Sequence, residues 1–313
     1  MPPTRLPSRS GASVHRLLPV SVLAGLAVAG TATLWGTSMA ATKAAIHDIH
    51  PVQLACFRFL VAGVLLSLLA RRRGSWPDLG WRAASLGLTG VALFIGIQNL
   101  GLRSARAADA TIVMGGALPA AAALLGLLIL RERLEPLKVA GLVCSLTGIS
   151  LVSLAIQGDD EASSLLGIAL LLVAAVSGAA YATLGRKAYQ APHLLPLLAG
   201  CSVYGSLFLM PVALLEVHLA GAPVLNAQSL SLLLYLGAGC SALGFVLWAF
   251  GLRHLTALQN ALICNLELPV GLLTAALAGE HIQESALAGG LLVVLGATLA
   301  VARWPVREVA PAT

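Results

Sequence analysis

Apolar stretches separated by short polar interruptions recur along the whole chain. Most are close to the roughly twenty residues that a helix needs to cross the hydrocarbon core of a bilayer. Backbone outside a helix cannot satisfy its hydrogen bonds in hydrocarbon, so each interruption predicts the end of a span. The pattern predicts ten transmembrane helices, at 17–41, 52–70, 83–102, 107–130, 139–156, 165–185, 194–215, 230–252, 257–277 and 286–301. We therefore expect an all-α polytopic membrane protein.

Composition supports this fold class. Of the 313 residues, 58% are hydrophobic and only 10% are charged, whereas soluble domains are about a quarter charged. The connections between the predicted spans leave no room for an extramembrane domain. All five cysteines fall inside predicted spans, and an odd number dispersed in lipid indicates packing, with no disulfide or metal site. These are Cys56, Cys144, Cys201, Cys240 and Cys264.

The basic residues predict the orientation, because lysine and arginine near helix ends accumulate on the cytoplasmic side. With the N-terminus inside, 15 of the 19 lysines and arginines face the cytoplasm, three lie outside and Arg58 lies within the second span. Both termini are thus predicted to be cytoplasmic, as tails 1–16 and 302–313. This distribution explains the net charge of +6 without a nucleic-acid partner. A cleaved signal peptide is the alternative for the first span, but its apolar run exceeds the 7–15 residues of a signal core.

The chain contains an internal duplication. When the chain is aligned with itself at an offset of 150 residues, Gly101-Leu102-Arg103 matches Gly251-Leu252-Arg253 and Leu118-Pro119 matches Leu268-Pro269. At an offset of 148 residues, the matches are Glu132 with Glu280, Ala140-Gly141 with Ala288-Gly289, and Gly148 with Gly296. The repeats are predicted at 17–156 and 165–301, joined by a periplasmic linker at 157–164. Five helices are an odd number, so the second repeat is expected to be inverted relative to the first. Inverted repeats around a central cavity suggest alternating access, and the paired glycines predict closely packed helices.

An ionisable side chain near the centre of a bilayer is costly, so each one in a span calls for a reason. Glu267 lies midway along the ninth predicted helix, just before Pro269, which removes a backbone donor and frees the carbonyl of Asn265. Asn260 shares a helical face with Glu267. One interpretation is that the carboxylate lines the cavity, where it binds a substrate amine or carries a proton. The alternative is that it is hydrogen-bonded within a helix interface and has a structural role.

Other polar and aromatic residues within the spans are further candidates. Arg58 is expected either to bind a substrate carboxylate or to snorkel toward the outer headgroups and anchor its helix. By the offset of 150, Gln98 and Asn99 correspond to Trp248 and Ala249, and these positions are predicted to line one cavity from opposite halves. Trp35 and Tyr181 are candidates too, with an aromatic belt at the membrane interface as the alternative.

Several motifs together resemble the EamA-type members of the drug/metabolite transporter superfamily. They are Trp35-Gly36-Thr37-Ser38 followed by Lys43, then Arg58-Phe59-Leu60 with Ala62, then Leu118-Pro119 leading to Arg131-Glu132-Arg133-Leu134, and, in the second half, Leu266-Glu267-Leu268-Pro269, Glu280, Gly289 and Gly296. The resemblance implies two five-helix bundles around a central cavity, in the inner membrane of a bacterium, exporting amino acids or related metabolites. Ala117 and the sequence after Glu280 depart from the family pattern.

The leading hypothesis is an inner-membrane exporter of an amino acid or similar small metabolite, in contact with membrane lipid. Proton coupling is a hypothesis, and the oligomeric state is left open. The sequence has no glycine-rich phosphate loop, His-Glu-x-x-His or Cys-x-x-Cys motif, so we expect neither an enzyme nor a cofactor or metal. A receptor or scaffold is the alternative, although it would not need a buried carboxylate beside a helix break.

Overall fold

The computed structural model describes residues 19–130, 136–155, 163–185, 188, 193–255, 260 and 263–301. Within these ranges the regular secondary structure is helical, with no strand. The predicted tails 1–16 and 302–313 and the linker positions 157–162 lie outside the described residues, as does the Arg131-Glu132-Arg133-Leu134 motif.

Helices occupy the described part of each predicted span of the first half. They are α1 (Val20–Ala45), α2 (Pro51–Arg72), α3 (Trp81–Gly87), the π-helical segment η1 (Leu88–Leu93), α4 (Phe94–Arg103), α5 (Ala107–Leu130) and α6 (Pro136–Ala155). The third predicted span is thus one helical run made of α3, η1 and α4. Polar or proline-containing segments separate the runs, as the hydrophobic pattern predicts.

The second half repeats this order. It contains α7 (Leu165–Gly185), α8 (Leu194–Ala220), α9 (Ala227–Leu234), the π-helical segment η4 (Tyr235–Leu243), α10 (Gly244–His254), α12 (Glu267–Leu277) and α13 (Glu284–Val301). The π-helix recurs in the third run of each half, at positions about 150 residues apart. A π-helix shifts the register of the backbone hydrogen bonds and is often found at functional sites.

Six described helical runs are long and apolar enough to cross a membrane: Val20–Ala45, Pro51–Arg72, Trp81–Arg103, Leu165–Gly185, Leu194–Ala220 and Ala227–Gly251. Four shorter apolar helices accompany them, at Ala107–Ala122, Val139–Leu151, Glu267–Leu277 and Glu284–Gly296. The chain is therefore a multi-pass membrane protein.

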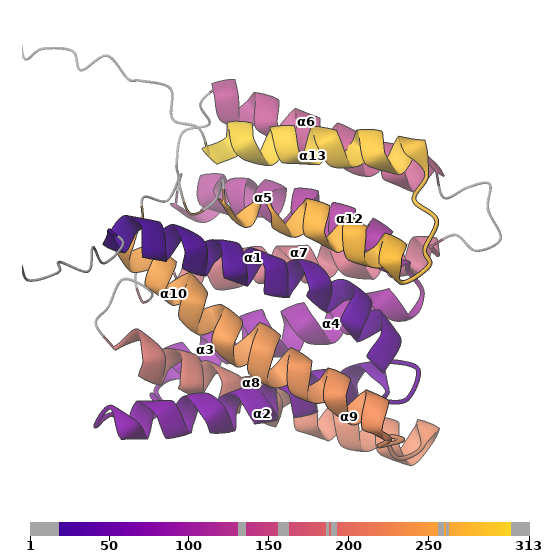
Figure 1. The fold of residues 1–313 in the computed structure, drawn as a ribbon. Coiled ribbons are helices and arrows are strands. Elements are labelled where there is room, and N and C mark those ends of the chain that lie inside the picture. Colours follow the sequence, from indigo (N-terminus) through magenta and orange to yellow (C-terminus); the bar gives the residue numbers. More distant parts are fainter. Residues whose placement is uncertain are drawn as a thin grey trace, which may run out of the picture.

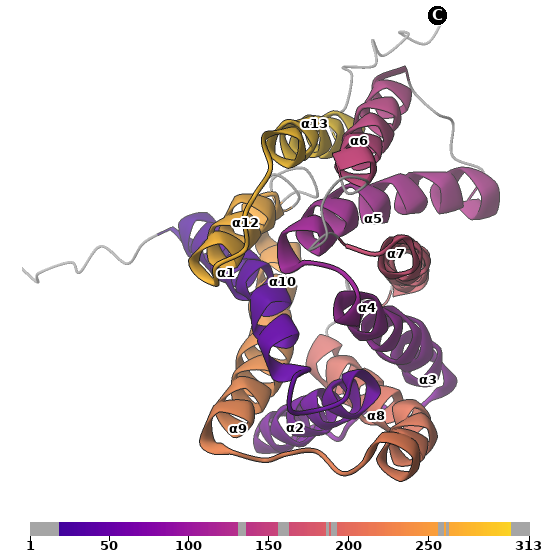
Figure 2. The same ribbon diagram turned by 90° about the vertical axis from the view of Figure 1, so that its right-hand side faces the viewer.

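The two halves exchange their first helices. α1 packs against α12 and α10 of the second half, and α7 packs against α5 and α4 of the first half. Equivalent helices also meet each other, α2 with α8 and α6 with α13. The helices run side by side across the view of Figure 1, with the pair α6 and α13 at one edge of the bundle and α2, α8 and α9 at the opposite edge. Figure 2 shows the same arrangement from the end of the bundle.

Glycine brings α6 and α13 together, as the paired glycines predict. A Cβ atom on Gly148 would lie 2.5 Å from the carbonyl oxygen of Gly289, and one on Gly296 would lie 2.5 Å from the carbonyl oxygen of Gly141. Each glycine position therefore admits the backbone of the facing helix where any larger residue would collide. Small residues drive helix association in lipid because they allow this close approach.

Candidate functional site

The ninth predicted helix is interrupted, and Glu267 does not lie midway along it. Asn265 and Leu266 form a turn, and α12 begins at Glu267. Pro269 explains the position of this start, because proline lacks a backbone N–H and is tolerated in the first turn of a helix. The N–H of Val270 then donates to the carbonyl of Leu266, at 3.2 Å. The equivalent Pro119 lies inside α5, which continues through it, so the two halves differ at this point.

Glu267 lies where α12 crosses α1. A Cβ atom on Gly36 would lie 2.7 Å from the backbone carbonyl oxygen of Glu267, and one on Gly271 would lie 3.3 Å from the carbonyl oxygen of Gly36. The Glu267 side chain is partly buried. No hydrogen bond or ion pair joins its carboxylate to another residue in the described part of the chain. The carboxylate is therefore available to a ligand or a proton.

Trp35 and Trp248 meet in an aromatic cluster between α1 and α10. Their ring centroids lie 6.2 Å apart, and Phe245 lies 5.5 Å from Trp35 and 6.4 Å from Trp248. The indole N–H of Trp35 donates to the carbonyl oxygen of Cys240 in η4, at 3.0 Å. Trp35 is thus held against η4, and its role as a site residue or as an interface belt residue stays a prediction.

Arg58 does not snorkel, so its interpretation as a headgroup anchor is wrong. The residue is only 4% exposed, and its Nε donates to Ser241 Oγ in η4, at 2.6 Å. The side chain turns toward η4 because η4 packs directly on α2: a Cβ atom on Gly237 would lie 3.0 Å from the carbonyl oxygen of Arg58. Hydropathy assigns a cost to a charge in a span, but it does not indicate the direction of the side chain.

The remaining candidates are spread over several helix contacts. Gln98 Nε2 donates to Met39 Sδ at 3.6 Å, and Asn99 Nδ2 donates to the carbonyl oxygen of Pro51 at 3.1 Å. Gln98 therefore contacts α1 and Asn99 contacts the start of α2. Neither of these hydrogen bonds reaches Trp248, so their shared cavity wall stays a prediction.

Three candidates from the second half lie on different helix contacts. Tyr181 in α7 packs against Gly90 in η1. Asn260 is buried, and its Oδ1 lies 3.0 Å from the Cβ position of Gly251 in α10. Asn265 Nδ2 donates to Thr298 Oγ1 in α13, at 3.2 Å. Asn265 thus faces α13 and is separate from the contact of α12 with α1.

A groove runs between α2 and α8, and it contains none of the predicted site residues. Its lining includes Leu60, Ser67, Arg71, Ser206 and Met210. Leu60 is 45% exposed, so this groove opens on the outside of the bundle. The central cavity that the repeats suggest stays a prediction.

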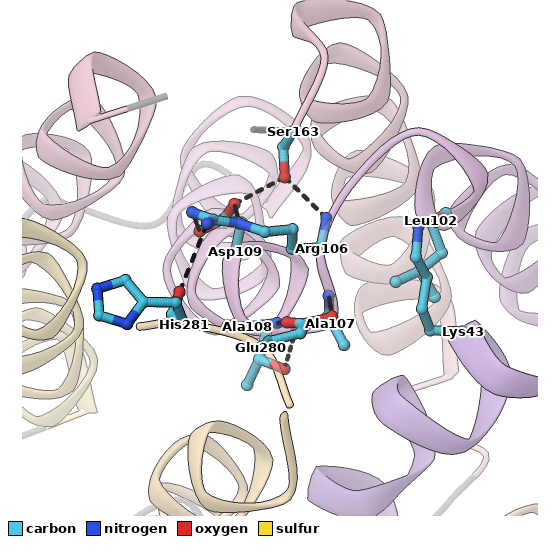
Figure 3. A network of polar contacts seen from close by, with 10 residues as sticks. Lys43, Leu102, Arg106, Ala107, Ala108, Asp109, Ser163, Glu280 and His281 are labelled. Carbon is cyan, nitrogen blue, oxygen red and sulfur yellow. Dashed lines mark hydrogen bonds and ion pairs between the residues drawn. The ribbon is translucent and has the colours of Figure 1, made fainter. Parts of the chain in front are cut away.

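A polar network at the end of the bundle predicted to face outward was not anticipated. Glu280, between α12 and α13, accepts hydrogen bonds from the backbone N–H groups of Ala107 and Ala108, both at 2.8 Å. Figure 3 shows its carboxylate against the first turn of α5. A carboxylate at a helix N-terminus satisfies orphan donors and complements the helix dipole. The match of Glu280 to Glu132 was the available sequence signal, although it did not reveal this role.

The same network contains an ion pair and a lysine. Arg106 Nε pairs with Asp109 Oδ2 at 2.9 Å, and Ser163 Oγ donates to the same carboxylate oxygen at 2.7 Å. Lys43 Nζ donates to the carbonyl oxygen of Leu102 at 2.7 Å, joining the ends of α1 and α4. These contacts tie together the ends of α1, α4, α5 and the segment before α7.

Three comparisons relate the chain to known proteins. The model of a family described as the EamA-like transporter family matches residues 22–154 and again residues 165–302. The two matches cover nearly the whole chain and correspond to its two halves. The chain also superposes on a solved crystal structure with a TM-score of 0.63 and 20% sequence identity. The superposition covers 88% of this chain and 96% of the chain in that structure. That likeness concerns the fold.

Curated relatives of similar length carry transporter names. An uncharacterised transporter of Archaeoglobus fulgidus is 27% identical over 88% of this chain and 98% of its own length. A probable terminal-alkyne amino-acid exporter of Streptantibioticus cattleyicolor is 27% identical over 86% and 90% of the two chains. A probable amino-acid metabolite efflux pump of Salmonella typhimurium is 27% identical over 88% and 94%.

Proposed function

The chain belongs to the EamA-like transporter family, and on this premise we propose that it is a secondary transporter that exports an amino acid or a related small metabolite. Two of its relatives are named as a probable amino-acid exporter and a probable amino-acid metabolite efflux pump. Family and relatives indicate a transporter rather than an enzyme, and a transporter acts on a small-molecule substrate.

The observation that carries the proposal is the unpaired carboxylate of Glu267 at the break before α12. Transporter sites are typically built where membrane helices are discontinuous, and ionisable groups in spans mark substrate or proton pathways. The aromatic cluster includes Trp35 on α1, one residue before Gly36, which packs on the Glu267 backbone. Glu267 thus binds a cationic group of the substrate or carries the coupled proton.

The mechanism that we propose is alternating access by two inverted five-helix repeats, at 17–156 and 165–301, in the bacterial inner membrane with both termini cytoplasmic. Support comes from the exchange of α1 and α7 between the halves and from the recurrence of the π-helix in each half. Two related halves provide two similar arrangements, one open to each side.

Flux from proteoliposomes loaded with labelled amino acids tests the proposal. We expect saturable efflux of at least one amino acid, with a rate that depends on the pH difference across the membrane. Glu267→Gln keeps the size of the side chain but cannot lose or gain a proton, so its flux is expected to lose that pH dependence. Glu284→Gln, at an exposed carboxylate at the start of α13, is the matched control.

The outcomes separate the parts of the proposal. Identical flux of wild type and Glu267→Gln at every pH would exclude coupling through this carboxylate. Flux of no solute above that of protein-free liposomes would favour a receptor or scaffold instead of a transporter.

A further inference from the structure

Arg58 carries an uncompensated positive charge inside the bundle. It is 4% exposed, and Ser241 Oγ accepts the bond from its Nε at 2.6 Å. Its Nη1 is buried and has no hydrogen-bond partner. Among the described residues, no carboxylate forms an ion pair with this guanidinium. Its aromatic contact is with Phe59, whose ring centroid lies 5.6 Å from Arg58 Cζ.

Burying the Arg58 guanidinium costs free energy unless an acceptor group pairs with it. A guanidinium has five N–H donors and remains charged in proteins. A buried charge without a partner strongly destabilises the folded protein. Arginines inside membranes are stabilised when an anion or backbone carbonyl groups accept their hydrogen bonds. The ionisable neighbours of Arg58 are the Cys240 thiol and the Tyr235 phenol, and the Tyr235 hydroxyl is already hydrogen-bonded to Thr37 Oγ1 at 2.5 Å. These groups do not neutralise the charge.

The position of Arg58 connects it to the candidate site. Ser241, which holds its Nε, follows Cys240, whose carbonyl accepts the indole N–H of Trp35. The segment η4 therefore contacts Arg58 on α2 and the aromatic cluster on α1 through two consecutive residues. Trp35 is in turn the neighbour of Gly36, which packs on Glu267. Contacts of η4 and α1 thus link Arg58, the aromatic cluster and the Glu267 backbone.

We propose that Arg58 binds the carboxylate of the transported solute and that Ser241 positions its guanidinium. The inference rests on the proposed function and narrows it: the substrate is an organic acid or a zwitterionic amino acid, and a simple amine or an amide is a poor substrate. The incoming carboxylate accepts the bonds that Nη1 does not make within the protein and neutralises the buried charge. Arginine suits this role because its planar donors match the geometry of a carboxylate.

The test compares solutes that differ only in the carboxylate. Efflux from proteoliposomes is measured with a labelled amino acid, in competition with the same amino acid, its primary amide and its methyl ester. For wild type we expect the acid to compete on the order of 10²-fold better than the amide or ester, as for loss of one partner of a buried charge pair. Arg58→Gln is expected to abolish this preference, and Arg58→Lys to keep part of it. Ser241→Ala is expected to reduce the preference without removing it.

Arg103→Gln, at an exposed arginine at the end of α4, is the matched control and is expected to leave the preference unchanged. The proposal is overturned if the amide and the ester compete with wild-type efflux as well as the acid does. It is also overturned if Arg58→Gln reduces competition by the acid and by the amide equally, which is the result expected of an arginine with a purely structural role. Absence of flux for every solute would count against the proposed function instead. In that case protection of purified protein against heat by the same solutes decides the inference: carboxylates must protect wild type and not Arg58→Gln.

Discussion

At the residue scale, the charges and polar groups that lipid should exclude could be recognised from the sequence, but their partners could not. Glu267 and Arg58 each stand out because they interrupt apolar runs. The turn of Arg58 toward Ser241 depends on the packing of η4 against α2, which brings together residues 183 positions apart. The hydrogen bond of Trp35 to Cys240 is equally hidden in the sequence, since it spans 205 positions.

Gly36 gives a residue-scale prediction, because its Cβ position lies 2.7 Å from the Glu267 carbonyl oxygen and 2.9 Å from Val270 Cβ. Gly36→Ala is expected to push α12 away from α1 and to destabilise the protein by about 1–3 kcal/mol, as overpacking does. Thermal unfolding of the purified protein in detergent measures the change. Gly30→Ala on the same helix is the control, because its nearest contact would be Leu247 Cδ1 at an ordinary 3.5 Å. Equal melting temperatures for the two variants would contradict the close approach.

At the element scale, the apolar runs predicted where helices lie, while the interruptions inside them needed the structure. Each predicted span contains helix in its described part, because hydrophobic length dictates helices in lipid. The π-helices η1 and η4 leave no mark in the hydrophobic pattern, since a π-helical turn changes hydrogen-bond register and not polarity. Pro269 predicts freed backbone groups near Glu267, but it does not by itself predict a break in the helix. The equivalent pair, Leu118-Pro119, lies within α5, which is continuous.

The cap that Glu280 forms on α5 gives an element-scale prediction. Glu280→Gln retains one acceptor oxygen but loses the charge and one of the two bonds to the N–H groups of Ala107 and Ala108. A lost helix cap costs about 0.5–2 kcal/mol, so the melting temperature is expected to fall. The drop should exceed that of Glu284→Gln, whose carboxylate is exposed. A variant as stable as wild type would show that Glu280 does not hold the start of α5.

At the scale of the whole molecule, the duplication is the feature that the sequence and the structure share most fully. Matched positions such as Gly101 and Gly251, or Gly148 and Gly296, lie in helices of the two halves, and the first helix of each half packs against helices of the other half. The family model also matches each half separately. Periodicity could not give the substrate, because specificity depends on side chains from several helices that meet only in the folded bundle. Arg58, Trp35 and Glu267 come from three different helices.

The central claim is that the halves cross the membrane in opposite senses and form one solute route. Reporter fusions at the N-terminus, within the linker 157–164 and at the C-terminus test it most directly in intact cells. The account predicts a cytoplasmic signal at both termini and a periplasmic signal in the linker. Termini on opposite sides of the membrane, or a linker on the same side as both, would contradict it.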